Sequence, residues 1–213
     1  MRTKTLLLTA VLSAAGAASS FAQVYSQNAV GYVNLALKPG FQLICNPLDN
    51  KAANGNTVSN LFAPCPDGTT VYVFDKAAQK FNTIGKEFGE WSNPNALLLP
   101  GDGAFVLLPP AVNVTVTAVG DVKQGTLTWP IIKGLQIVSS QVPQAGKIQA
   151  DLKYTPEEGD TVYQFDVTAQ KYLTRSYEFG AWSLEPTLAV GEAVFLLSPN
   201  PKSWNRTFSV NTP

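Results

Sequence analysis

Apolar and polar residues alternate along much of this chain with the two-residue period of a β-strand. The alternation is strictest over residues 112–119, where every second residue is Val or Ala and would share one buried face. Residues 96–99 and 104–108 are instead almost continuously apolar, which predicts strands buried on both faces. β-Branched and aromatic residues fill positions 69–74 and predict a further strand. The pattern as a whole predicts an all-β fold.

One short stretch departs from this period and predicts a helical turn. Val58, Leu61 and Phe62 are spaced as apolar residues are on one face of a helix. Asn56 or Thr57 would cap the turn, and a nearby proline would end it.

A 25-residue stretch occurs twice and divides the chain. Residues 68–92 return as residues 159–183, at an offset of 91 without a gap, with 15 of 25 positions identical. Flanking strands recur as well, so we expect two homologous tandem halves, at residues 29–117 and 118–213. Each would be a β-sandwich or barrel-like unit of about six strands with one short helix, at residues 146–152 in the second half. No flexible linker separates the halves, so they should pack closely or form one continuous domain.

The first 22 residues have the three parts of a secretory signal peptide. A short basic start, Met1 to Lys4, precedes a run of Leu, Val and Ala, and Ser20-Phe-Ala22 supplies small residues for cleavage. The apolar run is short for a spanning helix, which needs about 20 residues. We therefore expect an exported protein of the periplasm, cell surface or exterior, without a membrane span. A retained N-terminal anchor helix is the alternative.

Charge argues against nucleic acid and anionic membranes as partners. Without Arg2 and Lys4, 13 basic residues remain against 15 acidic ones, a net charge of −2. Only 14% of the residues are charged, so Asn, Gln, Ser and Thr must supply the polar surface. The partner that we expect is an envelope or extracellular protein, or a glycan.

The two cysteines of the chain predict one disulfide, Cys45–Cys65, because exported proteins meet an oxidising environment. The bridge would close a loop of about 20 residues and contribute roughly 3 kcal/mol. Ser139 and Pro156 stand at the matching positions of the second half, so the bridge would belong to the first half alone. Two free, buried thiols are the alternative.

The absence of histidine excludes the most familiar catalytic and zinc sites. It removes Ser-His-Asp and Cys-His nucleophiles and the commonest zinc ligand sets. The sequence has no phosphate-binding glycine loop, nucleophile elbow or Asp-rich calcium loop. We expect no cofactor, no metal site and no enzymatic activity.

Carboxylates remain as the one set capable of acid–base chemistry. Four pairs recur between the halves: Asp67 with Glu158, Asp75 with Asp166, Glu87 with Glu178, and Asp102 with Glu192. Roles in turns and at strand ends account for most of them, and two identical sites would be unusual for one enzyme. A carboxylate-based hydrolase is therefore the least favoured function.

The repeated Glu-Phe-Gly-x-Trp-Ser element is the strongest candidate for ligand binding. Its candidate site residues are Trp91, Glu87, Trp182, Glu178 and Tyr177. The aromatic rings could stack on sugars or on a peptide, while the glutamates accept hydrogen bonds from hydroxyl groups. The alternative is structural: both indoles fill the core together with Phe88 and Phe179.

Three motifs resemble a β-rich module of secreted and surface proteins of bacteria and some archaea. They are Gly40-Phe-Gln-Leu-Ile44, Val71-Tyr-Val-Phe-Asp75 and Leu99-Pro-Gly-Asp-Gly-Ala-Phe-Val106. Within it, the chain is most similar to small exported proteins of Verrucomicrobia and related bacteria. Phe41 stands where the module usually has Trp, and Ala104 where it usually has an aromatic residue. The resemblance implies a β fold and an extracellular location, and it supplies no established activity.

The favoured function is a secreted, non-enzymatic structural or interaction protein of the bacterial envelope or exterior. A glycan-binding module that uses the two Glu-Phe-Gly-x-Trp-Ser elements is the alternative. The exposure of Trp91 and Trp182 separates the two, because a buried indole cannot stack on a sugar ring.

Overall fold

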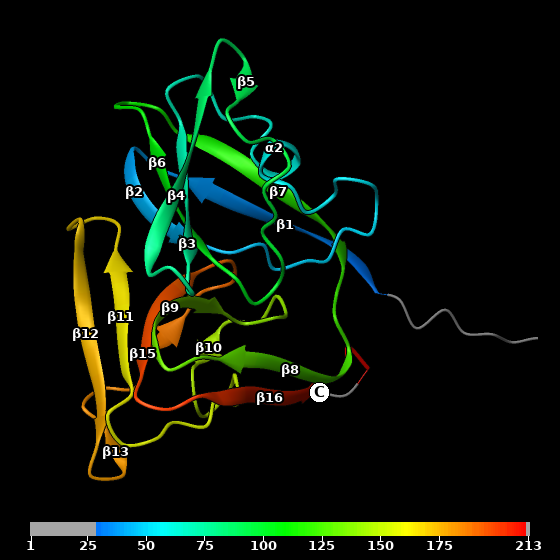
Figure 1. The fold of residues 1–213 in the computed structure, drawn as a ribbon. Helices are drawn as coiled ribbons and strands as arrows, with labels where there is room; N and C mark the ends of the chain where they lie inside the picture. Colours follow the sequence, from blue (N-terminus) through cyan, green and yellow to red (C-terminus); the bar gives the residue numbers. More distant parts are fainter. Residues whose placement is uncertain (1–28, 212–213) are drawn as a thin grey trace, which may run out of the picture.

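The structure is a computed structural model that describes residues 29–211, and it is built almost entirely of antiparallel β-strands (Figure 1). The predicted all-β fold is confirmed. The signal peptide predicted for residues 1–22 lies outside the described residues. Within residues 29–211, no helix has the length and apolar character needed to cross a membrane.

Two five-stranded sheets contain most of the strand residues, and both connect their strands in the same order. From edge to edge, the first contains β2 (Gly40–Ile44), β6 (Ala104–Leu108), β3 (Thr70–Asp75), β4 (Lys80–Glu87) and β5 (Glu90–Trp91). The second contains β9 (Gly134–Ser139), β15 (Ala193–Ser198), β11 (Thr161–Asp166), β12 (Lys171–Glu178) and β13 (Ala181–Trp182). The repeated 25-residue stretch therefore forms β3 to β5 in one sheet and β11 to β13 in the other.

Three two-stranded ribbons complete the fold. They are β1 (Val30–Leu37) with β7 (Val114–Asp121), β8 (Gly125–Ile131) with β16 (Lys202–Phe208), and β10 (Gly146–Lys147) with β14 (Thr187–Leu188). β7 pairs with β1 along its whole length, from Leu37 opposite Val114 to Val30 opposite Asp121. The division of the chain predicted after residue 117 therefore falls inside β7.

The one helix of the described residues, α2 (Val58–Leu61), forms where the apolar spacing predicts a helical turn. Thr57 caps it, because its Oγ1 accepts a hydrogen bond from the Asn60 amide at 3.3 Å. Val58 and Leu61 are both buried against the first half.

The second helix, expected at residues 146–152, is wrong: β10 and a turn occupy this segment. Carboxylates accept hydrogen bonds from several of its backbone amides. Glu185 accepts hydrogen bonds from the amides of Gln149 at 2.9 Å and Ala150 at 2.8 Å, and Asp151 accepts one from Lys147 at 2.8 Å. These side-chain bonds favour a turn over a continued helix.

Three clusters of buried apolar side chains form the core. One cluster fills each half, and the third joins them, with Leu43, Cys45 and Phe105 from the first half and Ile137, Ala193 and Phe195 from the second. Backbone bonds also cross reciprocally: the Cys45 amide donates to Gly191 at 2.8 Å, and the Ser139 amide donates to Gly101 at 3.0 Å. The two sheets therefore share one interface.

The predicted Cys45–Cys65 disulfide is wrong: both cysteines are free and buried. Side chains alternate along an extended strand, so Cys45 continues the face of Leu43, in the cluster between the halves. Ile44 points the other way, into the first-half core that also contains Cys65. The Cys45 thiol therefore lies in the cluster between the halves, whereas the Cys65 thiol lies in the core of the first half, on the other side of β2. Burial raises the pKa of Cys45 to about 12 and that of Cys65 to about 11.

Candidate functional site

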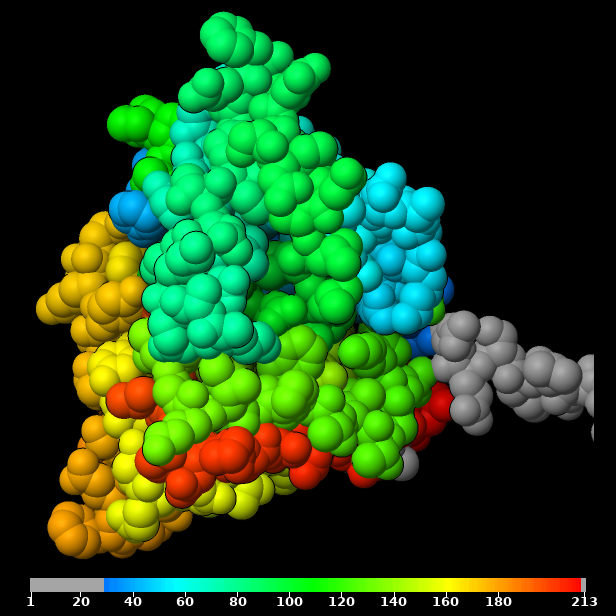
Figure 2. Space-filling view, in the orientation of Figure 1, coloured from blue at the N-terminus to red at the C-terminus, as the bar shows by residue number. Residues whose placement is uncertain are grey.

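The two Glu-Phe-Gly-x-Trp-Ser elements form the tips of two β-hairpins, which we call the hairpin tips. Two-residue turns join β4 to β5 and β12 to β13. Phe88 and Gly89 have φ angles of 53° and 82°, and Phe179 and Gly180 have φ angles of 54° and 75°. Positive φ at both central residues is the requirement of a type I′ turn. The hairpins project at opposite ends of the molecule, as Figure 2 shows.

A carboxylate from the preceding turn fixes each hairpin tip. Asp67 accepts a hydrogen bond from the Gly89 amide at 2.9 Å. In the second half, Glu158 accepts two, from Phe179 at 2.9 Å and from Gly180 at 2.6 Å. These bonds offset part of the cost of placing a phenylalanine in the left-handed region, which is about 1–2 kcal/mol.

The two tip phenylalanines are almost fully exposed: Phe88 at 96% and Phe179 at 97% of their surface. The expectation that they fill the core together with the indoles is therefore wrong. The physical reason is the turn, which carries its central residues beyond the last paired strand positions, Glu87 opposite Glu90 in the first half. A large apolar side chain held in solvent by a strained backbone is a feature that folding alone does not explain.

Trp91 lies in the core of the first half and is only 8% exposed. Its ring packs against Phe62 at a centroid distance of 6.3 Å, and the Lys86 ammonium group lies 5.7 Å from its centroid. Lys86 is held there because it also donates hydrogen bonds to the carbonyls of Ala63 and Cys65, at 3.0 and 2.7 Å. The geometry therefore supports a structural role for the Trp91 indole, which fills the core.

Trp182 is half-buried and packs against the core of the second half. Its indole N–H donates to Gln149 Oε1 at 3.1 Å, and the Tyr177 ring meets its ring edge-on at a centroid distance of 5.3 Å. The Tyr177 hydroxyl donates in turn to the Gly180 carbonyl at 2.9 Å. The structure therefore brings Tyr177 and Trp182 together as expected, and both brace the hairpin tip.

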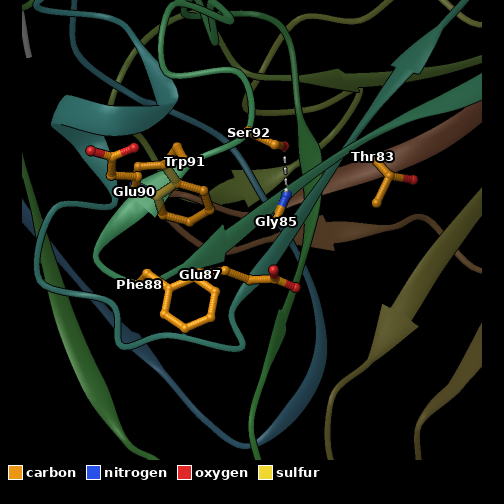
Figure 3. A pocket seen from close by; sticks show the side chains of 7 residues that line it. All are labelled: Thr83, Gly85, Glu87, Phe88, Glu90, Trp91 and Ser92. Carbon is orange, nitrogen blue, oxygen red and sulfur yellow. Dashed lines mark hydrogen bonds between the residues drawn. The ribbon is translucent and has the colours of Figure 1, made fainter.

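An open depression of about 500 Å³ lies along the first hairpin. Figure 3 shows the residues that line it: Thr83, Gly85, Glu87, Phe88, Glu90, Trp91 and Ser92. Ser92 Oγ accepts a hydrogen bond from the Gly85 amide at 3.1 Å, which joins the base of the hairpin. Glu87 and Glu90 are exposed and face each other across the last strand pair. The first tip is therefore an exposed phenyl ring flanked by acidic groups.

A buried polar cluster in the second half escaped the sequence analysis. Asp160 is fully buried and accepts hydrogen bonds from the Tyr154 hydroxyl at 2.7 Å, Ser198 Oγ at 2.8 Å and the Glu157 amide at 2.9 Å. It also forms an ion pair with Lys202. Burial, and then Asp160, raise the pKa of Tyr154. Every oxygen of this carboxylate has partners, so the cluster is a structural ion pair.

No metal site is evident among residues 29–211, since no three His, Cys, Asp or Glu side chains there lie close enough to hold an ion. A comparison with known protein families, curated proteins and solved structures found no match for this chain. The likeness to exported proteins of Verrucomicrobia therefore stays a prediction, and the functional argument rests on the geometry of the hairpin tips.

Proposed function

We propose that this chain is an exported, non-enzymatic interaction protein and that its two hairpin tips are its contact points. The observation that carries the proposal is the exposure of Phe88 and Phe179 at equivalent positions of two rigid turns. Residues held in strained backbone conformations cluster at functional sites, and here the strained residue at both tips carries a large apolar ring.

The energetics of such a contact favour binding through a pocket on the partner. Burying a phenylalanine side chain contributes about 1.5–3 kcal/mol. Asp67 and Glu158 hold the turns in place, so little ordering cost is added on binding. Each tip alone would bind weakly. Two tips at opposite ends can engage two partners, or two sites of one extended partner, and gain through avidity.

The glycan-binding alternative has less support. Stacking on a sugar requires an open aromatic face, and Trp91 is buried beneath Lys86. A phenyl ring with flanking carboxylates remains exposed at the first tip, so glycan binding is a distinguishable outcome of the same experiment.

The experiment measures retention of the purified protein on the envelope fraction of the bacterium that produces it. We compare the wild type with the double variant Phe88→Asn, Phe179→Asn, because Asn tolerates the left-handed region and removes only the ring. The double variant should lose at least ten-fold in retention. Treatment of the envelope with protease should abolish wild-type retention, whereas sensitivity to periodate alone would support the glycan alternative.

The matched control is Tyr32→Asn, which removes another exposed ring (72% of its surface) outside the tips. This variant should be retained like the wild type. Equal retention of the double variant and the wild type would overturn the proposal, because the tip rings would then make no contact.

A further inference from the structure

The buried ion pair of the second half holds an amine in contact with a carboxyl group. Asp160 precedes β11 and is fully buried, and the side chain of Lys202, the first residue of β16, is only 10% exposed. The Lys202 ammonium group pairs with Asp160 Oδ2, although the two residues lie 42 positions apart in the chain. An amine and a carboxyl group fixed side by side are the two reactants of an amide bond.

The surroundings of this pair are apolar and closed to solvent. Lys202 shares the inward face of β16 with Trp204, and Ile131 of β8 lies opposite Lys202 in the ribbon. Tyr154, Trp204 and Ile131 are each no more than 2% exposed. The Lys202 ammonium group lies 5.1 Å from the centroid of the Tyr154 ring. Because bulk water is excluded, a bond formed here is protected from hydrolysis.

Three donors hold the Asp160 carboxyl group and give its two oxygens different environments. Ser198 Oγ donates a hydrogen bond to Oδ1 at 2.8 Å. The Tyr154 hydroxyl and the Glu157 amide donate to Oδ2 at 2.7 and 2.9 Å. When the amine nitrogen attacks the carboxyl carbon, negative charge that develops on Oδ1 is stabilised by the Ser198 hydroxyl. Oδ2, which faces the amine, is then the oxygen that departs.

A second carboxylate lies close to the same amine. Glu157 Oε2 is 4.0 Å from the Lys202 nitrogen, and the Asn200 side-chain amide donates a hydrogen bond to this oxygen at 3.5 Å. The Glu157 side chain is 46% exposed, so it can exchange protons with solvent. A carboxylate in this place can take a proton from the amine and deliver it to the departing oxygen.

We propose that the folded protein joins Lys202 to Asp160 by an amide bond, with the release of one water molecule. The ammonium group first gives one proton to Asp160 Oδ2, which leaves a neutral amine and a neutral acid. The amine nitrogen then attacks Cγ, the Cγ–Oδ2 bond breaks, and Glu157 carries a second amine proton to Oδ2, which departs as water. The nitrogen keeps one hydrogen, no atom is oxidised or reduced, and no other reactant is consumed.

The bond supplies a covalent cross-link that the two cysteines, which are both free, do not. It ties the start of β16 to β11, the central strand of the second sheet (Figure 1). An amide is not broken by reductants, unlike a disulfide. The cross-link belongs to the second half alone, because Thr69 stands at the position of Asp160 in the first copy of the repeat.

Mass spectrometry of the purified, denatured protein tests the proposal. The wild type should be lighter than its sequence by one water molecule, and Lys202→Met should have its full calculated mass. The matched control is Lys147→Met, which removes an exposed lysine of the same half and should lose the water as the wild type does. After trypsin digestion, residues 154–171 and 176–206 of the wild type should form one cross-linked species, because trypsin does not cleave after an amidated lysine.

Glu157→Gln changes an exposed side chain, so this variant should fold, and its cross-linked fraction should fall at least ten-fold because the proton carrier is lost. A wild type with the full calculated mass would overturn the proposal. So would a loss of water that the digestion places outside these two peptides. A fully cross-linked Glu157→Gln variant would contradict the proton path.

Discussion

The side-chain amide of Gln170 binds both backbone polar groups of Phe41, a residue 129 positions earlier in the chain. It donates to the carbonyl at 3.0 Å and accepts from the amide at 2.9 Å. Gln79 makes the corresponding contact in the opposite direction, to Leu135. A glutamine of each half thus binds the edge strand of the other half through hydrogen bonds. We therefore expect the two halves to unfold together.

Gln170→Ala should lower the free energy of unfolding by about 2 kcal/mol, because it removes two hydrogen bonds between the halves. Alanine meets the same positive φ as glutamine, so the change reports the side chain alone. Gln79→Ala should cost about half as much. Urea unfolding followed by tryptophan fluorescence measures both, and a Gln170→Ala variant with an unchanged midpoint would refute the role of this contact.

Lys202→Met should destabilise the protein by about 3–5 kcal/mol, because it leaves the buried Asp160 carboxylate without its counter-charge. The matched control is Lys51→Met, which removes the exposed partner of Asp49 and should cost less than about 1 kcal/mol. Thermal unfolding of the two variants compares them. Equal losses would contradict the assignment of Asp160 and Lys202 as a buried structural pair.

In urea, and without any reductant, a thiol reagent should detect both cysteines as free thiols. In the folded protein at pH 8, neither cysteine should react with the reagent. Burial holds the folded pKa of Cys65 at about 11 and that of Cys45 at about 12, above the usual value of 9.0. The folded state therefore favours the protonated thiols. Their contribution to stability is complete below about pH 9 and decreases as the pH rises towards 11. An oxidised chain without titratable thiols would contradict the structure.

Of the two aromatic residues at the first hairpin tip, Trp91 should stabilise the fold and Phe88 should not. Trp91→Ala should cost about 3–5 kcal/mol, because it empties a buried site. Phe88→Asn should leave the free energy of unfolding unchanged or raise it by up to about 1 kcal/mol, since Asn tolerates positive φ and the ring buries nothing. Urea unfolding of both variants is the measurement. A clear loss on Phe88→Asn would make the phenyl ring a structural element.

Alternation and turn chemistry predict most strands of this protein, because both are local. The strand expected at residues 96–99, buried on both faces, is wrong: the segment forms no strand, and Leu97 and Leu99 are exposed, because a continuous apolar run does not reveal which of its residues face the core. The strand expected at residues 112–119 appears as β7, and the helical turn appears as α2. The disulfide and the second helix are wrong for reasons that are not local. Which face of β2 receives Cys45 depends on how the halves pack, and the turn near Gln149 depends on Glu185, 36 residues later.

The candidate site is predicted in place but not in orientation. Two-residue hairpin loops usually contain Asn-Gly or Asp-Gly, and Phe-Gly stands in their place here, so the signal for the turns that put Phe88 and Phe179 at the tips is weak. The sequence marks both indoles as candidate ligand contacts, and only the packing of the first half shows that Trp91 turns inward.

The most direct test of the account is photo-cross-linking from the hairpin tips in the producing cells. p-Benzoylphenylalanine replaces Phe88 or Phe179 in turn, and Tyr32 as an exposed aromatic control. The account predicts discrete adducts from positions 88 and 179 and none of the same mass from position 32. The absence of adducts from both tips, or the same adducts from position 32, would contradict the claim that the tip phenylalanines are the contact points of this protein.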